Sequence, residues 1–176
     1  MAVQPLPQII LLENISFGDV VRALADKRGF AAISNPRFSI VASNPKNSIS
    51  FSGAFVTTDG HTQIDNPLDS VARFFDLARR MPCDPYLPFS GGCIGYMGFE
   101  GAKTILGYEP AKGFSRFPQC KFGLYETVYI FNHVEKISYV VANGDDSGWE
   151  VVIPAKAGIQ PVLIKTGSPI KTFGDD

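Results

Sequence analysis

The sequence has few of the residues that build metal centres and disulfide frameworks. Its 176 residues include three cysteines and two histidines. Cys83, Cys93 and Cys120 are odd in number and widely spaced, which indicates reduced, partly buried thiols rather than a zinc site or a disulfide framework. His61 and His133 have no carboxylate or cysteine at ligand spacing, so each is predicted to be a solvated turn residue. The sequence therefore predicts no metal site.

An excess of charge and a long apolar run are also missing. Lys and Arg total 16 against 17 Asp and Glu, and the net charge of −1 does not favour a nucleic-acid partner. No apolar run is long enough to span a bilayer, and the start, Met1–Pro5, lacks the basic region and apolar core of a signal peptide. We therefore expect a cytoplasmic protein with no membrane partner. With 45% hydrophobic residues, the chain can bury a substantial core.

The sequence does contain two clear helix patterns. In the first, apolar residues recur at helical spacing after Ser16, which can cap the helix, and Gly29 is predicted to end it. The second begins at Asn66-Pro67, where proline suits the first turn, and ends near Arg79-Arg80. A further short helix is expected near 101–106.

Strand patterns fill most of the remaining chain. They cover residues 9–12, 30–34, 38–42, 48–52, 55–58, 62–64, 122–131 and 137–142. Asp59-Gly60 is a strong hairpin signal, and 122–131 is predicted to be one long central strand because of its β-branched and aromatic density. Adjacent hairpins with two helices predict an α+β fold with a mainly antiparallel sheet.

A glycine-rich stretch, Leu87–Glu100, stands near the middle of the chain. Its glycines at 91, 92, 95 and 98 lack the Gly-x-Gly-x-x-Gly order, and no Lys-Ser/Thr follows, so the nucleotide-binding fingerprints fail. Glycine inside a strand usually marks a bulge or a close backbone approach. The stretch is therefore predicted to be a tightly packed strand, with ligand contact as the alternative.

Three blocks of sequence follow one another along the chain, and they are Arg37–Pro45, Leu87–Glu100 and Phe117–His133. In this order they resemble the N-terminal domain of the anthranilate synthase and aminodeoxychorismate synthase large-subunit family, and the resemblance covers roughly residues 8–143. The second block is similar to the family's Pro-Phe-x-Gly-Gly-x-x-Gly-x-x-Gly-Tyr-Asp pattern. Its Leu-Pro-Phe-x-Gly-Gly sequence, together with the short first block, favours the aminodeoxychorismate branch, which leads to para-aminobenzoate and folate. The alternatives are a fragment of anthranilate synthase component I that retains part of a tryptophan-binding regulatory site, and an unrelated α+β binding module.

The resemblance implies an enzyme subunit that acts on chorismate with magnesium and receives ammonia from a glutamine amidotransferase subunit. In that family the chorismate and magnesium residues lie in a C-terminal catalytic region, for which we find no counterpart here. We therefore expect a truncated N-terminal fragment that is inactive alone and has no catalytic residue, metal ligand or cofactor of its own. Such a fragment is expected to expose an apolar face and to self-associate.

The resemblance also implies part of a tryptophan pocket, regulatory in anthranilate synthases and structural in some aminodeoxychorismate synthases. The matching positions are Ser34, Arg37 and Phe38. A serine hydroxyl could meet the ammonium or carboxylate of tryptophan, and a phenylalanine ring could stack on its indole. The alternative is a turn serine, a solvated arginine and a core phenylalanine. Because the family completes the pocket from its catalytic region, we expect weak tryptophan binding or none.

The last part of the chain departs from the family. Ile153–Gln160 resembles a peptide encoded by dispersed palindromic repeats of some bacterial genomes. We therefore predict two parts, 1–147 as the family-like domain and 148–176 as a foreign, weakly ordered tail. An ordinary loop with a short terminal strand is the alternative.

Overall fold

The computed structural model describes residues 7–12, 14–108, 117–143 and 162–164. The chain divides into two compact units: a first unit of residues 1–44, 82–91 and 126–176, and a second unit of residues 45–81 and 92–125. Each unit is built around its own antiparallel sheet. The predicted division between residues 147 and 148 lies outside the described residues, so it stays a prediction.

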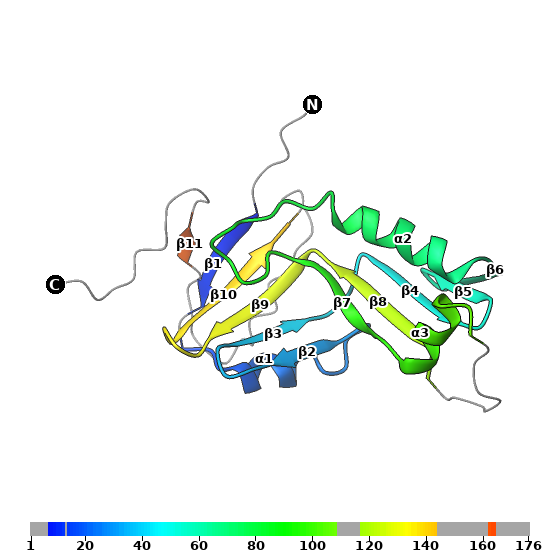
Figure 1. The fold of residues 1–176 in the computed structure, drawn as a ribbon. Coiled ribbons are helices and arrows are strands. Elements are labelled where there is room, and N and C mark those ends of the chain that lie inside the picture. The colour runs from blue at the N-terminus through cyan, green and yellow to red at the C-terminus, as the bar shows by residue number, and fades with distance from the viewer. Residues whose placement is uncertain (1–6, 13, 109–116, 144–161, 165–176) are drawn as a thin grey trace. The chain divides into compact units, whose positions relative to one another are not determined.

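The first unit contains a six-stranded sheet and helix α1 (Phe17–Leu24), as Figure 1 shows. Its strands, in spatial order, are β11 (Val162–Ile164), β1 (Gln8–Leu12), β10 (Ile137–Ala142), β9 (Thr127–Asn132), β3 (Phe38–Ala42) and β2 (Ala31–Ser34). The short strand β11 lies inside the predicted tail and pairs antiparallel with β1. The alternative expectation for this part of the chain included such a terminal strand.

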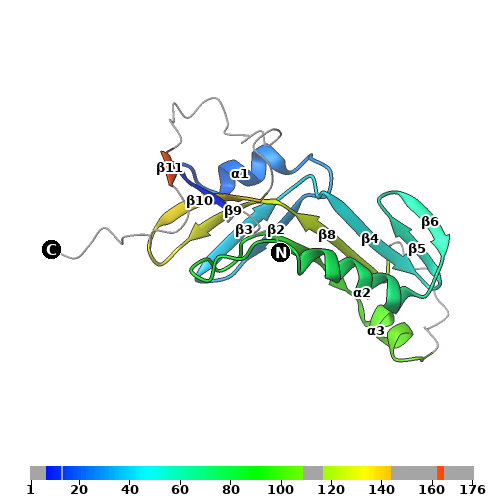
Figure 2. The ribbon, with the colours of Figure 1, turned by 90° about the horizontal axis from the view of Figure 1, so that it is seen from above.

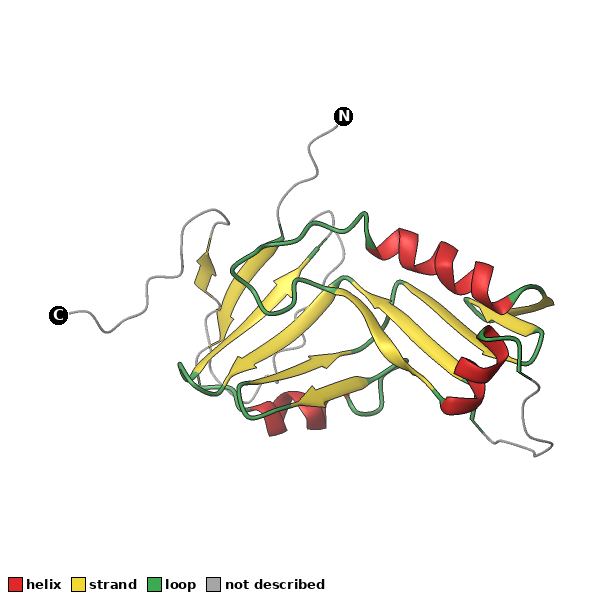
Figure 3. Ribbon diagram, viewed as in Figure 1, coloured by secondary structure: helices red, strands yellow, loops and turns green. Residues whose placement is uncertain are grey.

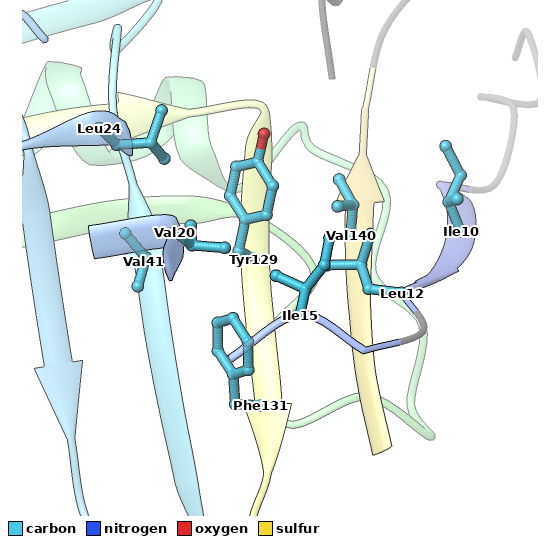
Figure 4. Packing of buried hydrophobic residues seen from close by; sticks show 9 residues of the cluster. All are labelled: Ile10, Leu12, Ile15, Val20, Leu24, Val41, Tyr129, Phe131 and Val140. Atoms are coloured by element: carbon cyan, nitrogen blue, oxygen red, sulfur yellow. The ribbon is translucent and has the colours of Figure 1, made fainter. Parts of the chain in front are cut away.

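Helix α1 packs on one face of this sheet. Ser16 and Asp19 form a reciprocal capping box at its N-terminus. The buried residues of the helix, the strands and the segment between β1 and α1 form one apolar cluster, shown in Figure 4: Ile10, Leu12, Ile15, Val20, Leu24, Val41, Tyr129, Phe131 and Val140. The rings of Phe17 and Phe131 meet edge to face, 5.7 Å apart. The helix ends at Leu24, so the prediction that it continues to Gly29 is wrong. The intervening residues form turns instead, including a hydrogen bond from Lys27 N to Leu24 O.

The second unit contains a five-stranded sheet with α2 (Pro67–Ala78) and α3 (Phe99–Ile105). Its strands, in spatial order, are β6 (His61–Ile64), β5 (Phe55–Thr58), β4 (Asn47–Ser52), β8 (Cys120–Tyr125) and β7 (Gly92–Met97). Asp59 and Gly60 both have positive φ, which is the conformation that a two-residue hairpin turn requires. The hairpin prediction is therefore confirmed.

Helix α2 lies along the sheet of the second unit (Figure 2) and closes its core. Val71 and Phe74 of α2 are buried against Ile49, Phe51 and Val56 of the strands. Asn66 caps the helix by accepting hydrogen bonds from the backbone of Leu68 and Asp69, as expected for an Asn-Pro start. The described residues of the whole chain contain three helices, coloured red in Figure 3, and the fold is α+β with mainly antiparallel strands, as predicted.

The predicted strand 122–131 is two strands. It breaks at Glu126, where β8 ends in the sheet of the second unit and β9 starts in the sheet of the first. Each half is an interior strand with a neighbouring strand on both sides in its own sheet, which agrees with the predicted position away from a sheet edge. The residues on both sides of Glu126 are β-branched or aromatic, and propensity alone therefore gives no signal of the break.

The glycine-rich stretch forms β7 and pairs with β8. A Cβ atom placed on Gly95 would lie 2.1 Å from the Lys121 carbonyl oxygen and 2.5 Å from the Phe122 ring. Those distances leave no room for any side chain at this position. The prediction of tight packing is confirmed at Gly95.

Candidate functional site

A chain of three polar side chains crosses one end of the sheet of the first unit. The Ser34 and Ser39 hydroxyl oxygens lie 2.7 Å apart, and Ser39 Oγ lies 2.7 Å from His133 Nε2. Ser34 and Ser39 are cross-strand partners on β2 and β3, and Ser39 is the partner of Phe131 on β9, two residues before His133. Side chains of directly paired residues share a face, and so do residues two apart in a strand. The strand register therefore brings the side chains of Ser34, Ser39 and His133 together on one face of the sheet.

Two turns bring these residues to the same end of the sheet. In the β2–β3 turn, the Asn35 side-chain oxygen accepts hydrogen bonds from the backbone N–H groups of Arg37 and Phe38. The backbone N–H of His133 donates to the carbonyl of Arg37 at 2.8 Å, which extends the pairing of β3 and β9 past Asn132. His133 is thus fixed by its backbone as well as by its ring.

Ser39 is buried, with 1% of its surface exposed, whereas Ser34 and His133 are both exposed. A buried hydroxyl needs hydrogen-bond partners to offset its loss of water, and Ser39 has two. Ser39 therefore links an exposed serine to an exposed histidine through the interior. Among the described residues, no hydrogen bond joins the other nitrogen of His133 to a carboxylate. The three side chains form a polar relay rather than a triad.

The structure places the three predicted site residues differently. Ser34 ends β2 and belongs to the chain of polar side chains. Arg37 lies exposed in the β2–β3 turn, and Phe38 begins β3 and is half-buried. Because Phe38 directly precedes Ser39, strand alternation turns its side chain to the opposite face of the sheet. Ser34 therefore meets Ser39 and His133, but it does not share a face with Phe38.

Sequence reasoning missed Ser39 and His133 as partners of Ser34. His133 was predicted to be a solvated turn residue, and its position at an exposed turn is confirmed. Its contact with Ser39 spans 94 residues of sequence. One signal was available, because Ser39 lies in the first family-like block and His133 ends the third.

The described part of the chain provides little other chemistry. It contains no group of three or more His, Cys, Asp or Glu side chains that could hold a metal ion. Burial raises the pKa of the Cys93 and Cys120 thiols to about 11, which disfavours their reactive thiolate forms. No described helix has the length and apolar character needed to cross a membrane.

Some known proteins are similar to this chain in sequence. No model of a known protein family matches the sequence. The chain is 33% identical over 116 residues to anthranilate synthase component 1 of Lactococcus lactis, covering 61% of this chain and 24% of that protein. It is 29% identical over 119 residues to the chloroplastic anthranilate synthase alpha subunit 2 of Arabidopsis thaliana, covering 60% of this chain and 19% of that protein. The chain thus spans a quarter or less of these relatives.

A solved structure, that of anthranilate synthase component I from Streptococcus pneumoniae, covers 77% of this chain and 32% of its own, with 27% identity and a TM-score of 0.47. Both sequence relatives are components of anthranilate synthases. The chain is thus similar to these anthranilate synthase components over part of their length.

Proposed function

We propose that this chain is an N-terminal part of component I of a chorismate-utilising synthase, and that it does not convert chorismate on its own. The observation that carries the proposal is the pairing of the three family-like blocks. The first block meets the third where β3 pairs with β9, and the second meets the third where β7 pairs with β8. Blocks that matched by chance would have no reason to become neighbouring strands.

The branch within this class is a finer proposal. The sequence pattern of the second block supports aminodeoxychorismate synthase of folate biosynthesis, whose amino donor would come from a glutamine amidotransferase subunit. The names of the two curated relatives support anthranilate synthase as the second candidate. Both candidates share the reactants chorismate and ammonia and differ in the product.

The test of this proposal is a product assay. The purified chain would be incubated with chorismate, magnesium and ammonium, and the products would be separated by liquid chromatography. We expect neither aminodeoxychorismate nor anthranilate above a blank without protein. The Lactococcus lactis relative, assayed in parallel, is the positive control for anthranilate. Clear turnover by this chain would contradict the inactivity, and its product would identify the branch.

We further propose that Ser34, Arg37 and Phe38 border a partial tryptophan site. The exposed Ser34 hydroxyl is available to the ammonium or carboxylate of the ligand, and the exposed Arg37 guanidinium in the adjacent turn suits the carboxylate. Phe38 lies on the other face, so it can reach the indole only around the end of the sheet. The geometry therefore supports Ser34 more strongly than Phe38.

Single substitutions separate these contributions. Ser34→Ala is expected to weaken tryptophan binding roughly five-fold, the effect of one lost hydrogen bond, while Phe38→Leu should change it less. Ser52→Ala, an exposed serine of the second unit, is the matched control. Chemical-shift titration suits the weak affinity expected of a partial pocket. Micromolar affinity in calorimetry would instead show that the site is complete, and a larger loss with Phe38→Leu would place the ligand on the opposite face.

A further inference from the structure

We propose that the proton on His133 decides, through Ser39, whether the Ser34 hydroxyl donates or accepts a hydrogen bond at its ligand. His133 would then be a positioning residue that touches no ligand itself. This inference rests on the proposed amino-acid site beside Ser34. The observation behind it is the unbroken series of two 2.7 Å contacts from Ser34 through Ser39 to His133.

The proton count of the hydroxyls fixes the direction of the relay. A serine hydroxyl has one proton to donate and two lone pairs to accept with. When His133 Nε2 carries no proton, it can only accept, so Ser39 must donate its single proton to the ring. Ser39 then accepts from Ser34. The Ser34 proton is committed inward, and its oxygen offers only lone pairs to a ligand.

Protonation of the ring releases this constraint. Both ring nitrogens of a protonated histidine are donors, so Nε2–H now donates to Ser39. The Ser39 proton becomes free to point at Ser34, and the Ser34 proton can turn outward. Ser34 thereby changes from a group that only accepts into one that can donate. Because Ser39 is buried, it has few alternatives among which to distribute its proton.

The two states favour opposite ligand groups. A Ser34 oxygen that only accepts suits an ammonium, whereas a donating Ser34 hydroxyl suits a carboxylate. The positive charge of the protonated ring acts in the same sense, since it repels an ammonium and attracts a carboxylate. Both effects predict that acid shifts the site from cation recognition to anion recognition.

Other charged groups lie in the turns beside this relay and on α1, which packs on the same sheet, and their effects must be separated from that of His133. They are Arg37 in the β2–β3 turn, Glu135 and Lys136 in the β9–β10 turn, and Asp19 and Arg22 on α1. Asp19 is bound to Ser16 and Arg22 at the start of the helix. The chain offers a matched control for the ring itself, because its only other histidine, His61, is exposed on β6 in the second unit.

The first experiment tests the relay without any ligand. Long-range proton–nitrogen NMR on the intact chain reports which ring nitrogen of His133 carries the proton. At about pH 8 we expect Nε2 to be the unprotonated nitrogen, and Ser39→Ala should shift its resonance while His61 stays unchanged. A proton found on Nε2 at that pH, or a spectrum indifferent to Ser39→Ala, would overturn the relay.

The second experiment tests its consequence with two one-sided probes. Tryptamine carries the ammonium without the carboxylate, and indole-3-propionate carries the carboxylate without the ammonium. Between about pH 8 and pH 5.5, tryptamine binding should weaken roughly five-fold and indole-3-propionate binding should strengthen by a similar factor. His133→Gln and Ser39→Ala should each abolish the opposed response, and His61→Gln should retain it.

The two experiments fail in distinguishable ways. If neither probe binds at millimolar concentration while the NMR result stands, the proposed ligand site is wrong and the proton relay is real but serves no indole ligand, which overturns its assigned role. If both probes bind and His133→Gln keeps the opposed response, the inference is wrong and the ligand site survives. Circular dichroism of each variant confirms that it is folded.

Discussion

The two units have similar architectures, but each contains a different kind of unusual residue. Each packs at least one helix on an antiparallel sheet and buries a compact apolar core. In the second unit the unusual residue is Gly95. Neighbouring backbone and ring atoms leave no space for a side chain there, which explains why the residue is glycine. In the first unit the unusual residues are Ser39 and His133, a buried hydroxyl and an exposed imidazole whose contact no apolar packing requires.

This difference distinguishes a residue that determines packing from residues that carry polar groups. A glycine that is surrounded on the Cβ side by its neighbours specifies how closely two strands approach, and it has no functional group to offer a ligand. A buried serine between two surface polar groups costs desolvation that a valine or alanine would avoid. Gly95 of the second unit therefore has a packing role, and the first unit is where ligand chemistry should be sought.

The largest expected effect tests the packing side of this comparison. Gly95→Ala should destabilise the fold by about 3 kcal/mol, at the upper end of the cost of overpacking, because the added Cβ would meet the Lys121 carbonyl at 2.1 Å. Urea denaturation followed by circular dichroism measures the change. A loss below about 1 kcal/mol would show that β7 and β8 can separate freely and that the glycine has another role.

Gly18 in the first unit is the matched control for that substitution. A Cβ at Gly18 would have its nearest neighbours at 3.8 Å, an ordinary contact distance, and the residue lies inside α1. Alanine is the better helix former, so Gly18→Ala should stabilise the fold by about 0.5 kcal/mol. Opposite signs at Gly95 and Gly18 would confirm that local space decides the outcome.

Local signals predicted most of the fold. Asp59-Gly60 fixed a hairpin because its turn needs two residues with positive φ, and Ser16 and Asn66 marked the helix starts because their side chains cap free N–H groups. The break at Glu126 was not predicted. Its cause is the assignment of β8 and β9 to different sheets, which is a long-range choice that leaves no mark on strand propensity.

The candidate site was predicted only in part, for a similar reason. The family resemblance selected Ser34, but neither turn chemistry nor spacing could pair it with His133, because that contact depends on the register of three strands. A shift of one residue in β3 would turn Ser39 to the other face. The face of Phe38 follows from the same register, so a resemblance that names neighbouring positions cannot say which of them act together.

The cysteines offer a second way to test the comparison. Cys83 is exposed in the first unit, whereas Cys93 and Cys120 lie in the second unit with pKa values raised to about 11 by burial. At pH 7.5 a thiol reagent should modify Cys83 on the order of 100-fold faster than Cys120, because burial of Cys120 disfavours its thiolate and limits the access of the reagent. Mass spectrometry of timed samples measures the rates.

Denaturant supplies the control for this labelling. In about 8 M urea the three thiols should react at similar rates, because burial is the source of the difference. Comparable rates for Cys83 and Cys120 in the native protein would mean that the second unit opens readily, and the close packing inferred at Gly95 would then be wrong.

The smallest expected effect concerns a carboxylate that anchors a helix start in each unit. A hydrogen bond from Ser70 lowers the pKa of Asp65 beside α2, and one from Ser16 lowers that of Asp19 on α1. A folded-state pKa below the ordinary value of 3.8 means that each carboxylate stabilises the fold at neutral pH and loses that contribution as the pH falls through the acid range.

Ser70→Ala and Ser16→Ala should therefore each flatten the loss of stability between about pH 7 and pH 3, measured by urea denaturation. Asp76→Asn, at an exposed ion pair of α2, is the control and should leave the slope unchanged. If Ser70→Ala flattens the profile and Ser16→Ala does not, the capping box of α1 contributes nothing to acid sensitivity, and the two helix starts are not equivalent.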